Sequence, residues 1–186
     1  MSVLLYHGTT EIFDIIDPSR GKGYKDFGRG FYATRRKEHA ESIAKRNKRI
    51  KMERQNKIIQ RNPNYKKVAY NAYRYNLIYS EKTEGLNVKI FKTADVEWAK
   101  FILMNRRSEF TGHNYDIVIG PTADEETTTI INQYEPLLIK NDYCDEILKQ
   151  LVSELKPENL PKQYFFANEK AIATLKFCPE KRRIVG

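Results

Sequence analysis

Three short segments of the sequence carry side chains that suit the binding of a polar ligand. The first ends an apolar strand in His7 and Gly8, the second is the loop Gly28-Arg29-Gly30-Phe31-Tyr32, and the third begins a late strand with Gln163. A histidine donates or accepts hydrogen bonds, a tyrosine offers a ring face, and glycine lets backbone approach a ligand closely. Taken singly, these residue types are weak signals of a binding site.

Each segment also has an ordinary structural explanation when it is considered alone. A histidine at a strand end satisfies its ring nitrogens by local hydrogen bonds, and a glutamine on a strand is a common cross-strand partner. The Gly28-x-Gly30 loop is not the dinucleotide-binding fingerprint, because it precedes a strand, whereas that motif follows a strand and opens a helix. The order of the three segments is therefore more informative than any one of them.

That order resembles the ADP-ribosyltransferase superfamily, in its His-Tyr-Glu branch. The pattern there is a strand ending in His-Gly, a Gly-x-Gly-x-Tyr loop, a helix rich in small residues and a late strand beginning Glu-Tyr. The chain matches it over about residues 3 to 44 and 161 to 178. The middle is similar to an uncharacterised bacterial family of that superfamily, whose members are often encoded beside a small partner, as toxin–antitoxin pairs are. The motifs that carry this second likeness are Glu97-Trp98, Phe101 to Arg106 and Tyr115 to Pro121.

The resemblance implies an α+β fold, an ADP-ribosyltransferase-like split β-sandwich with helices around it. It implies NAD⁺ as substrate and His7, Tyr32 and Gln163 as catalytic residues, with His7 on the adenosine ribose and Tyr32 stacked on nicotinamide. The residues expected to contact NAD⁺ are His7, Gly8, Thr9, Arg29, Gly30, Tyr32, Asn105 and Arg106. Asn105 and Arg106 also have a second interpretation, as the solvated end of a helix.

Gln163 departs from the family pattern, which has glutamate there. A glutamine carbonyl accepts the ribose hydroxyl's hydrogen bond, but it carries no charge and cannot act as a base. The expected function is therefore mono-ADP-ribosylation of a macromolecular target, by the toxin of a bacterial toxin–antitoxin pair. Two alternatives stay open: an NAD⁺ glycohydrolase, and a non-catalytic nucleic-acid- or protein-binding module with a vestigial NAD pocket.

Length and composition favour one globular domain over residues 1–186. The sequence contains neither an apolar run long enough to span a membrane nor a secretory signal, and its two cysteines, Cys144 and Cys178, are isolated. These features predict a cytoplasmic protein that does not bind a membrane. We expect no metal, because the three histidines and two cysteines lack ligand spacing.

The net charge of +9 has one source. Residues 44–67 hold 10 of the 33 lysines and arginines and a single acid, Glu53, while the rest of the chain balances. A basic helical segment at about 36–67 is therefore expected to dock a macromolecular target, nucleic acid or acidic protein, alongside a small antitoxin-like partner. The alternative is a solvated helix without a partner.

The elements expected to position these residues follow from hydrophobic periodicity and breakers. Asp124 is expected to cap the helix that follows it. We expect strands over residues 2–6, 31–34, 68–79, 86–92, 115–119, 163–167 and 175–178. We expect helices over residues 36–61, 95–106, 142–155 and 169–175. Residues 123–135 are ambiguous because of their three consecutive threonines, and 123–133 could still be helical.

Overall fold

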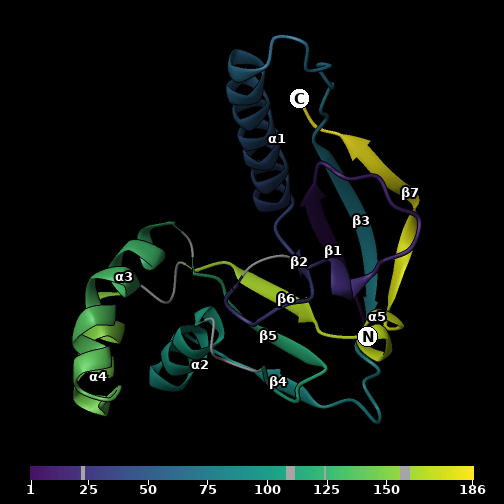
Figure 1. Cartoon of the computed structure of the whole chain (residues 1–186). Coiled ribbons are helices and arrows are strands. Elements are labelled where there is room, and N and C mark those ends of the chain that lie inside the picture. The colour runs from purple at the N-terminus through teal and green to yellow at the C-terminus, as the bar shows by residue number, and fades with distance from the viewer. Residues whose placement is uncertain (22–23, 108–111, 124, 156–159) are drawn as a thin grey trace. The chain divides into compact units, whose positions relative to one another are not determined.

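A computed structural model of the chain describes all residues except 22–23, 108–111, 124 and 156–159 (Figure 1). The described residues form seven strands, five α-helices and the 3-10 helix Pro18–Arg20. The strands are β1 (Ser2–Thr9), β2 (Phe31–Thr34), β3 (Tyr73–Ser80), β4 (Val88–Ile90), β5 (Ile117–Pro121), β6 (Lys162–Phe166) and β7 (Leu175–Ile184). The helices are α1 (Lys37–Arg61), α2 (Val96–Arg106), α3 (Glu125–Lys140), α4 (Asp145–Glu154) and α5 (Glu169–Ile172). The α+β class is confirmed.

The strands make a mixed sheet in the hydrogen-bonding order β4-β5-β6-β2-β1-β3-β7. β4 and β5 are parallel, and the β5–β6, β1–β2, β1–β3 and β3–β7 pairs are antiparallel. β1 pairs with β3 over its whole length, from Ser2 opposite Ser80 to Thr9 opposite Tyr73. The backbone at His7 and Gly8 is thus held in a regular ladder.

Contacts between residues divide the chain into two compact units. The first unit comprises residues 1–16, 33–82 and 174–186, and the second comprises 17–32 and 83–173. β2 contributes to both, since Phe31 and Tyr32 belong to the second unit and Ala33 and Thr34 to the first. Of the expected site residues, His7, Gly8 and Thr9 lie in the first unit and the others in the second.

In the first unit, α1 packs on β1 through small side chains. Ala40 and Ala44 are fully buried, and a β-carbon on Gly8 would lie 1.8 Å from the Ala40 carbonyl oxygen. Such close approach of helix and strand requires glycine at this position. The apolar face of α1 is thin, because Ile43 and Ile50 are only half-buried.

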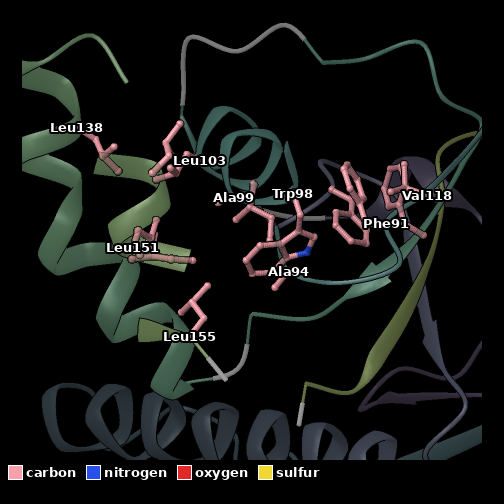
Figure 2. Close-up of a cluster of buried hydrophobic side chains, with 14 residues drawn as sticks. Phe91, Ala94, Trp98, Ala99, Leu103, Val118, Leu138, Leu151 and Leu155 are labelled. Carbon is pink, nitrogen blue, oxygen red and sulfur yellow. The ribbon is translucent and has the colours of Figure 1, made fainter. Parts of the chain in front are cut away.

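The core of the second unit is larger and mostly aliphatic and aromatic (Figure 2). Trp98 and Ile102 of α2 are fully buried, and Leu138 of α3 and Leu151 of α4 pack in the same cluster. α2 begins as expected, since the Asp95 carboxylate accepts a hydrogen bond from the Trp98 N–H. This core fixes the C-terminal end of α2, where Asn105 and Arg106 lie. Asp124, the expected cap of α3, lies outside the described residues.

Several element boundaries differ from expectation, for local reasons. Residues 68–72 are not strand: both the N–H and the carbonyl of Val68 bond the side chain of Gln55 on α1, at 2.7 and 3.0 Å. The helix expected from residue 142 starts at Asp145, because Asp142 and Tyr143 have φ of 48° and 54°. A helix excludes such left-handed backbone.

Two strands continue past residues that were expected to end them. β5 includes Gly120 and Pro121, and the Pro121 carbonyl accepts a hydrogen bond from Trp98 Nε1 at 3.0 Å. β7 extends beyond Cys178 to Ile184, through a shift of register against β3. Asn76 Nδ2 donates to the Glu180 carbonyl at this irregularity, at 2.7 Å. A side chain thus replaces a missing ladder bond.

Candidate functional site around Asp26

The Asp26 carboxylate joins four segments of the second unit. Its Oδ1 accepts hydrogen bonds from Arg106 Nε at 3.1 Å and Nη2 at 2.7 Å. Its Oδ2 accepts from Gln163 Nε2 at 2.8 Å and from the Ala123 N–H at 2.9 Å. The side chains of Asp26 and Arg106 are 9% and 21% exposed, so the pair is largely shielded from water. Four donors and one opposite charge stabilise the buried carboxylate and hold it in one orientation.

Arg106 and Gln163 reach this carboxylate from well-separated parts of the sequence. Arg106 is the last residue of α2, and its Nη2 also donates to Thr128 Oγ1 of α3 at 3.2 Å. Gln163 lies near the start of β6 and is half-buried. The tertiary structure therefore brings together two of the residues selected from the sequence, on a third that was not selected.

Tyr32 is held beside this cluster by the turn that contains Asp26. Its hydroxyl donates to the Gly28 carbonyl at 2.6 Å and accepts from the Phe27 N–H at 3.1 Å. Its ring centroid lies 5.1 Å from that of Phe165 and 5.0 Å from Lys25 Nζ. Burial, and secondarily the nearby Asp26 charge, raises the pKa of Tyr32 well above its ordinary value. The phenol thus remains a neutral donor.

Gly30 holds the loop before β2 against β6. A β-carbon there would lie 2.4 Å from the Phe165 ring and 2.6 Å from the Phe166 carbonyl oxygen. The absence of a side chain is therefore required by packing within the second unit. Arg29, in contrast, is exposed and lies over the Tyr24 ring, with 5.6 Å between its guanidinium carbon and the ring centroid. Arg29 is not among the hydrogen-bond or ion-pair partners that the described residues supply to Asp26.

Asn105 presents a buried acceptor next to the same loop. Its Nδ2 donates to the Phe101 carbonyl at 2.8 Å, while its Oδ1 has no hydrogen-bond partner among the described residues. The residue is 3% exposed, and a β-carbon at Gly28 would lie 3.2 Å from this oxygen. Because a buried acceptor left unpaired costs about 1–3 kcal/mol, this oxygen suits a donor from outside the described chain.

His113, which sequence reasoning missed, also lies next to Gly28: a β-carbon there would lie 3.9 Å from His113 Nε2. Its Nε2 lies 2.9 Å from the Phe27 carbonyl, and its Nδ1 accepts from the Tyr115 N–H at 3.1 Å. These partners require a neutral imidazole that carries its proton on Nε2. Burial lowers the pKa of His113, which favours the same form. His113 therefore acts as a fixed support for the turn at Phe27.

In the first unit, His7 lies next to Phe13, which belongs to the segment that follows β1. The ring of Phe13 is edge-on to His7, with centroids 5.9 Å apart, and stacks on Tyr75 at 4.1 Å. The Tyr75 hydroxyl accepts from the Phe13 N–H at 2.8 Å and donates to its carbonyl at 3.2 Å. Thr9 Oγ1 accepts from the Glu11 N–H at 3.1 Å, which turns the chain after β1.

Asp26 itself was missed because its neighbours in the sequence do not indicate its role. It lies in the segment Lys25 to Gly30, which is charged and glycine-rich apart from Phe27, and an aspartate in such a segment is ordinarily a solvated turn residue. Its partners Arg106 and Gln163 are 80 and 137 residues away. A useful signal would have been an acid two residues before the Gly-x-Gly loop, combined with an arginine at a helix end.

Two further observations concern metal binding and membrane insertion by the described residues. Within them, no three or more His, Cys, Asp or Glu side chains lie close enough together to hold a metal ion. Nor does any helix among them have the length and apolar character needed to cross a bilayer.

Comparison with known proteins identifies the family of this α+β chain. A family model described as protein of unknown function (DUF3990) matches residues 3–177. Since the match includes nearly the whole chain and both units, the chain belongs to this family. No curated protein matches the sequence.

Proposed function

We propose that the chain binds NAD⁺ and transfers its ADP-ribose to a macromolecular target, as a mono-ADP-ribosyltransferase with a split β-sandwich fold. One observation carries the proposal. Arg106 and Gln163, both selected from the sequence, meet on the buried carboxylate of Asp26, and Tyr32 is fixed by the same turn. Polar side chains from α2, β6 and the loop before β2 thus form one organised cluster beside the glycine loop.

The chemistry of this cluster fits the breaking of a glycosidic bond to nicotinamide. The reaction passes through an oxocarbenium-like state, so the protein's task is to hold the dinucleotide in a bent conformation and to orient its ribose. The half-buried Gln163 supplies an acceptor for a ribose hydroxyl, and the Tyr32 ring supplies a surface for nicotinamide. Asn105 Oδ1, which has no partner among the described residues, suits an N–H donor such as the nicotinamide carboxamide.

The resemblance extends the assignment to residues outside the cluster. From the first unit it assigns His7 to the adenosine ribose, with Gly8 and Thr9 as backbone contacts. Arg29 is assigned to the pyrophosphate on its charge and exposure. NAD⁺ is a substrate in this scheme, and no metal takes part. By the same resemblance, the protein acts in the bacterial cytoplasm as the toxin of a pair with a small antitoxin-like partner.

The basic segment of α1 supports a docking role for the macromolecular target. Lys45, Arg46, Arg54 and Lys57 are exposed, and the helix is anchored to the first unit by Ala40, Ala44 and Gln55. An exposed cationic face on a long helix attracts polyanions from a distance. We assign residues 44–67 to the binding of the target.

Calorimetry with NAD⁺ tests the assignment of Tyr32. Tyr32→Ala should weaken NAD⁺ binding by about 1–3 kcal/mol, because stacking and packing on nicotinamide are lost. The matched control is Tyr65→Ala, a change at an exposed tyrosine beyond α1 that should leave binding unchanged. Tyr32→Phe keeps the ring and guards against misfolding of the alanine variant. Equal NAD⁺ affinity in all four proteins would remove Tyr32 from the site.

The fate of ADP-ribose separates the proposed function from its alternatives. Cell lysate incubated with labelled NAD⁺ should yield a modified macromolecule, detected by mass spectrometry. Free ADP-ribose without a modified target would identify a glycohydrolase instead. Absence of NAD⁺ binding, combined with steeply salt-dependent binding of nucleic acid, would identify a binding module.

A further inference from the structure

The carboxamide of Gln163 has one chemically allowed orientation. The atoms near its Nε2 are Asp26 Oδ2 at 2.8 Å and the Pro121 carbonyl oxygen at 3.5 Å. Both are acceptors, so a flipped amide would place Oε1 against two oxygens. Because the amide is planar, Oε1 faces away from Asp26, and it accepts no hydrogen bond from the described residues.

Asp26 is in turn too constrained to move away from Gln163. Its Oδ1 is held by Arg106 through two donors, and its Oδ2 also accepts from the Ala123 N–H. The position of the carboxylate is therefore fixed by α2 and by the backbone after β5 before any substrate binds. Because the carboxylate is fixed, it also fixes the orientation of a side chain that donates a hydrogen bond to it.

We propose that Asp26 is the positioning residue for Gln163, holding the amide by its nitrogen so that Oε1 is presented to the substrate's ribose hydroxyl. The inference rests on the proposed function and identifies the residue that orients the amide of Gln163 in its active site. It also explains why an amide is suited to this position. A carboxylate at residue 163 would lie at hydrogen-bond distance from the Asp26 carboxylate, and two such groups do not both ionise.

The proposal predicts how Gln163→Glu behaves. In its protonated form the introduced carboxyl donates to Asp26 and presents a carbonyl, as the amide does. The charged groups that face it are Asp26, which raises its pKa, and Arg106, which lowers it from the far side of Asp26. Lys162 is exposed on the same strand, and Tyr32 is a neutral phenol. Asp26 lies closest, so the pKa at residue 163 should be raised.

Activity of Gln163→Glu should therefore fall as pH rises through this raised pKa. Below it, the protonated carboxyl keeps both the donor and the carbonyl of the amide, and nicotinamide release by this variant is at its highest. Above it, the ionised group is expelled from Asp26, and kcat drops on the order of 10- to 100-fold, the effect of a misplaced catalytic contact. The wild type, with an amide at this position, lacks this step in its profile.

Two measurements test the pairing of Asp26 with residue 163: the pKa of the introduced glutamate, and the effect of a double variant. Carbon-13 NMR of labelled glutamate in Gln163→Glu reports the pKa without requiring activity, and the matched control is Gln133→Glu on the exposed face of α3. We expect an elevated pKa at residue 163 and an ordinary one at residue 133. Exchanging donor and acceptor in the double variant Asp26→Asn/Gln163→Glu should return the pKa towards normal and restore turnover above neutral pH.

The outcomes separate this inference from the proposed function. A wild type that binds NAD⁺ but shows the same pH profile as Gln163→Glu would overturn the positioning role alone. An ordinary pKa at residue 163 in the single variant would do the same, whatever the activity. A wild type that neither binds NAD⁺ nor releases nicotinamide would overturn the proposed function, and the positioning role with it.

Discussion

The two units of the molecule use charge in opposite ways. In the second unit, one buried carboxylate, Asp26, gathers donors from α2, β6 and the backbone after β5. In the first unit, the excess positive charge is spread along the exposed face of α1, where ion pairs such as Arg49–Glu53 are largely solvated. Buried charge is costly unless every group is paired, whereas exposed charge costs little. The first arrangement specifies geometry, and the second provides a long-range field.

The largest effect should follow from removing the central carboxylate. Asp26→Ala leaves Arg106 without its ion-pair partner and the Ala123 N–H without its acceptor, and Gln163 Nε2 keeps only its 3.5 Å contact with the Pro121 carbonyl oxygen. We expect a loss of about 3 kcal/mol or more in the free energy of unfolding, measured by denaturant titration. As a control, Asp14→Ala removes an exposed partner of Lys181 and should leave the midpoint unchanged. Equal stability of the two variants would break the contrast between the units.

A smaller loss should follow from a change where α1 meets β1. In Gly8→Ala the new β-carbon would lie 1.8 Å from the Ala40 carbonyl, so helix and strand must separate. Overpacking of this kind costs about 1–3 kcal/mol, which a thermal melt without ligand would show. If Gly8 is required only for contact with NAD⁺, the variant will melt as the wild type does and will lose NAD⁺ affinity alone.

Reversing the charge of α1 should have the smallest effect on stability and a large effect on binding. The tested substitutions are Arg46→Glu, Arg49→Glu, Arg54→Glu and Arg61→Glu in one chain. We expect thermal stability close to that of the wild type, loss of target modification, and unchanged hydrolysis of NAD⁺. Fluorescence anisotropy with duplex DNA measures the polyanion affinity directly. For the parent chain it should fall about 10³-fold or more between about 50 and 200 mM salt if several phosphates are contacted.

A matched control distinguishes the effect of charge located on α1 from the effect of the net charge of the whole chain. Four exposed lysines elsewhere are reversed to glutamate: Lys100, Lys140, Lys149 and Lys176. This variant has the same net charge as the α1 variant and should retain polyanion binding and target modification. If both variants lose binding equally, net charge and not α1 is responsible. If neither loses it, α1 is a solvated face.

Much of the secondary structure follows from local sequence. A helix was expected over residues 36–61 and is found at Lys37–Arg61, and the strand expected over residues 31–34 is found at Phe31–Thr34. The start of α2 follows from the Asp95 cap, and its buried face follows from the spacing of Trp98 and Ile102. In each case the decisive interactions lie within a few residues, where periodicity and capping act.

Other elements depended on partners that are distant in the sequence. Residues 68–72 have the alternation of a strand, yet Gln55 on α1 supplies the hydrogen bonds to Val68. α3 continues to Lys140 with Pro136 inside it, because Leu138 is drawn into the core of the second unit. Burial and side-chain bonding outweighed local propensity in both places.

The sequence by itself determined which residue types the chain offers for a ligand, namely His7, the Gly28–Tyr32 loop and Gln163, and where the excess charge lies. Only the tertiary structure decided that Gln163 and Arg106 share the Asp26 carboxylate. Arg106 is 80 positions and Gln163 is 137 positions from Asp26 in the sequence, so the three meet only when α2 and β6 pack in one core. The physical reason is the range of the forces involved. Hydrogen bonds act over about 3 Å, so their partners are set by folded geometry, whereas composition and charge are properties of the chain itself.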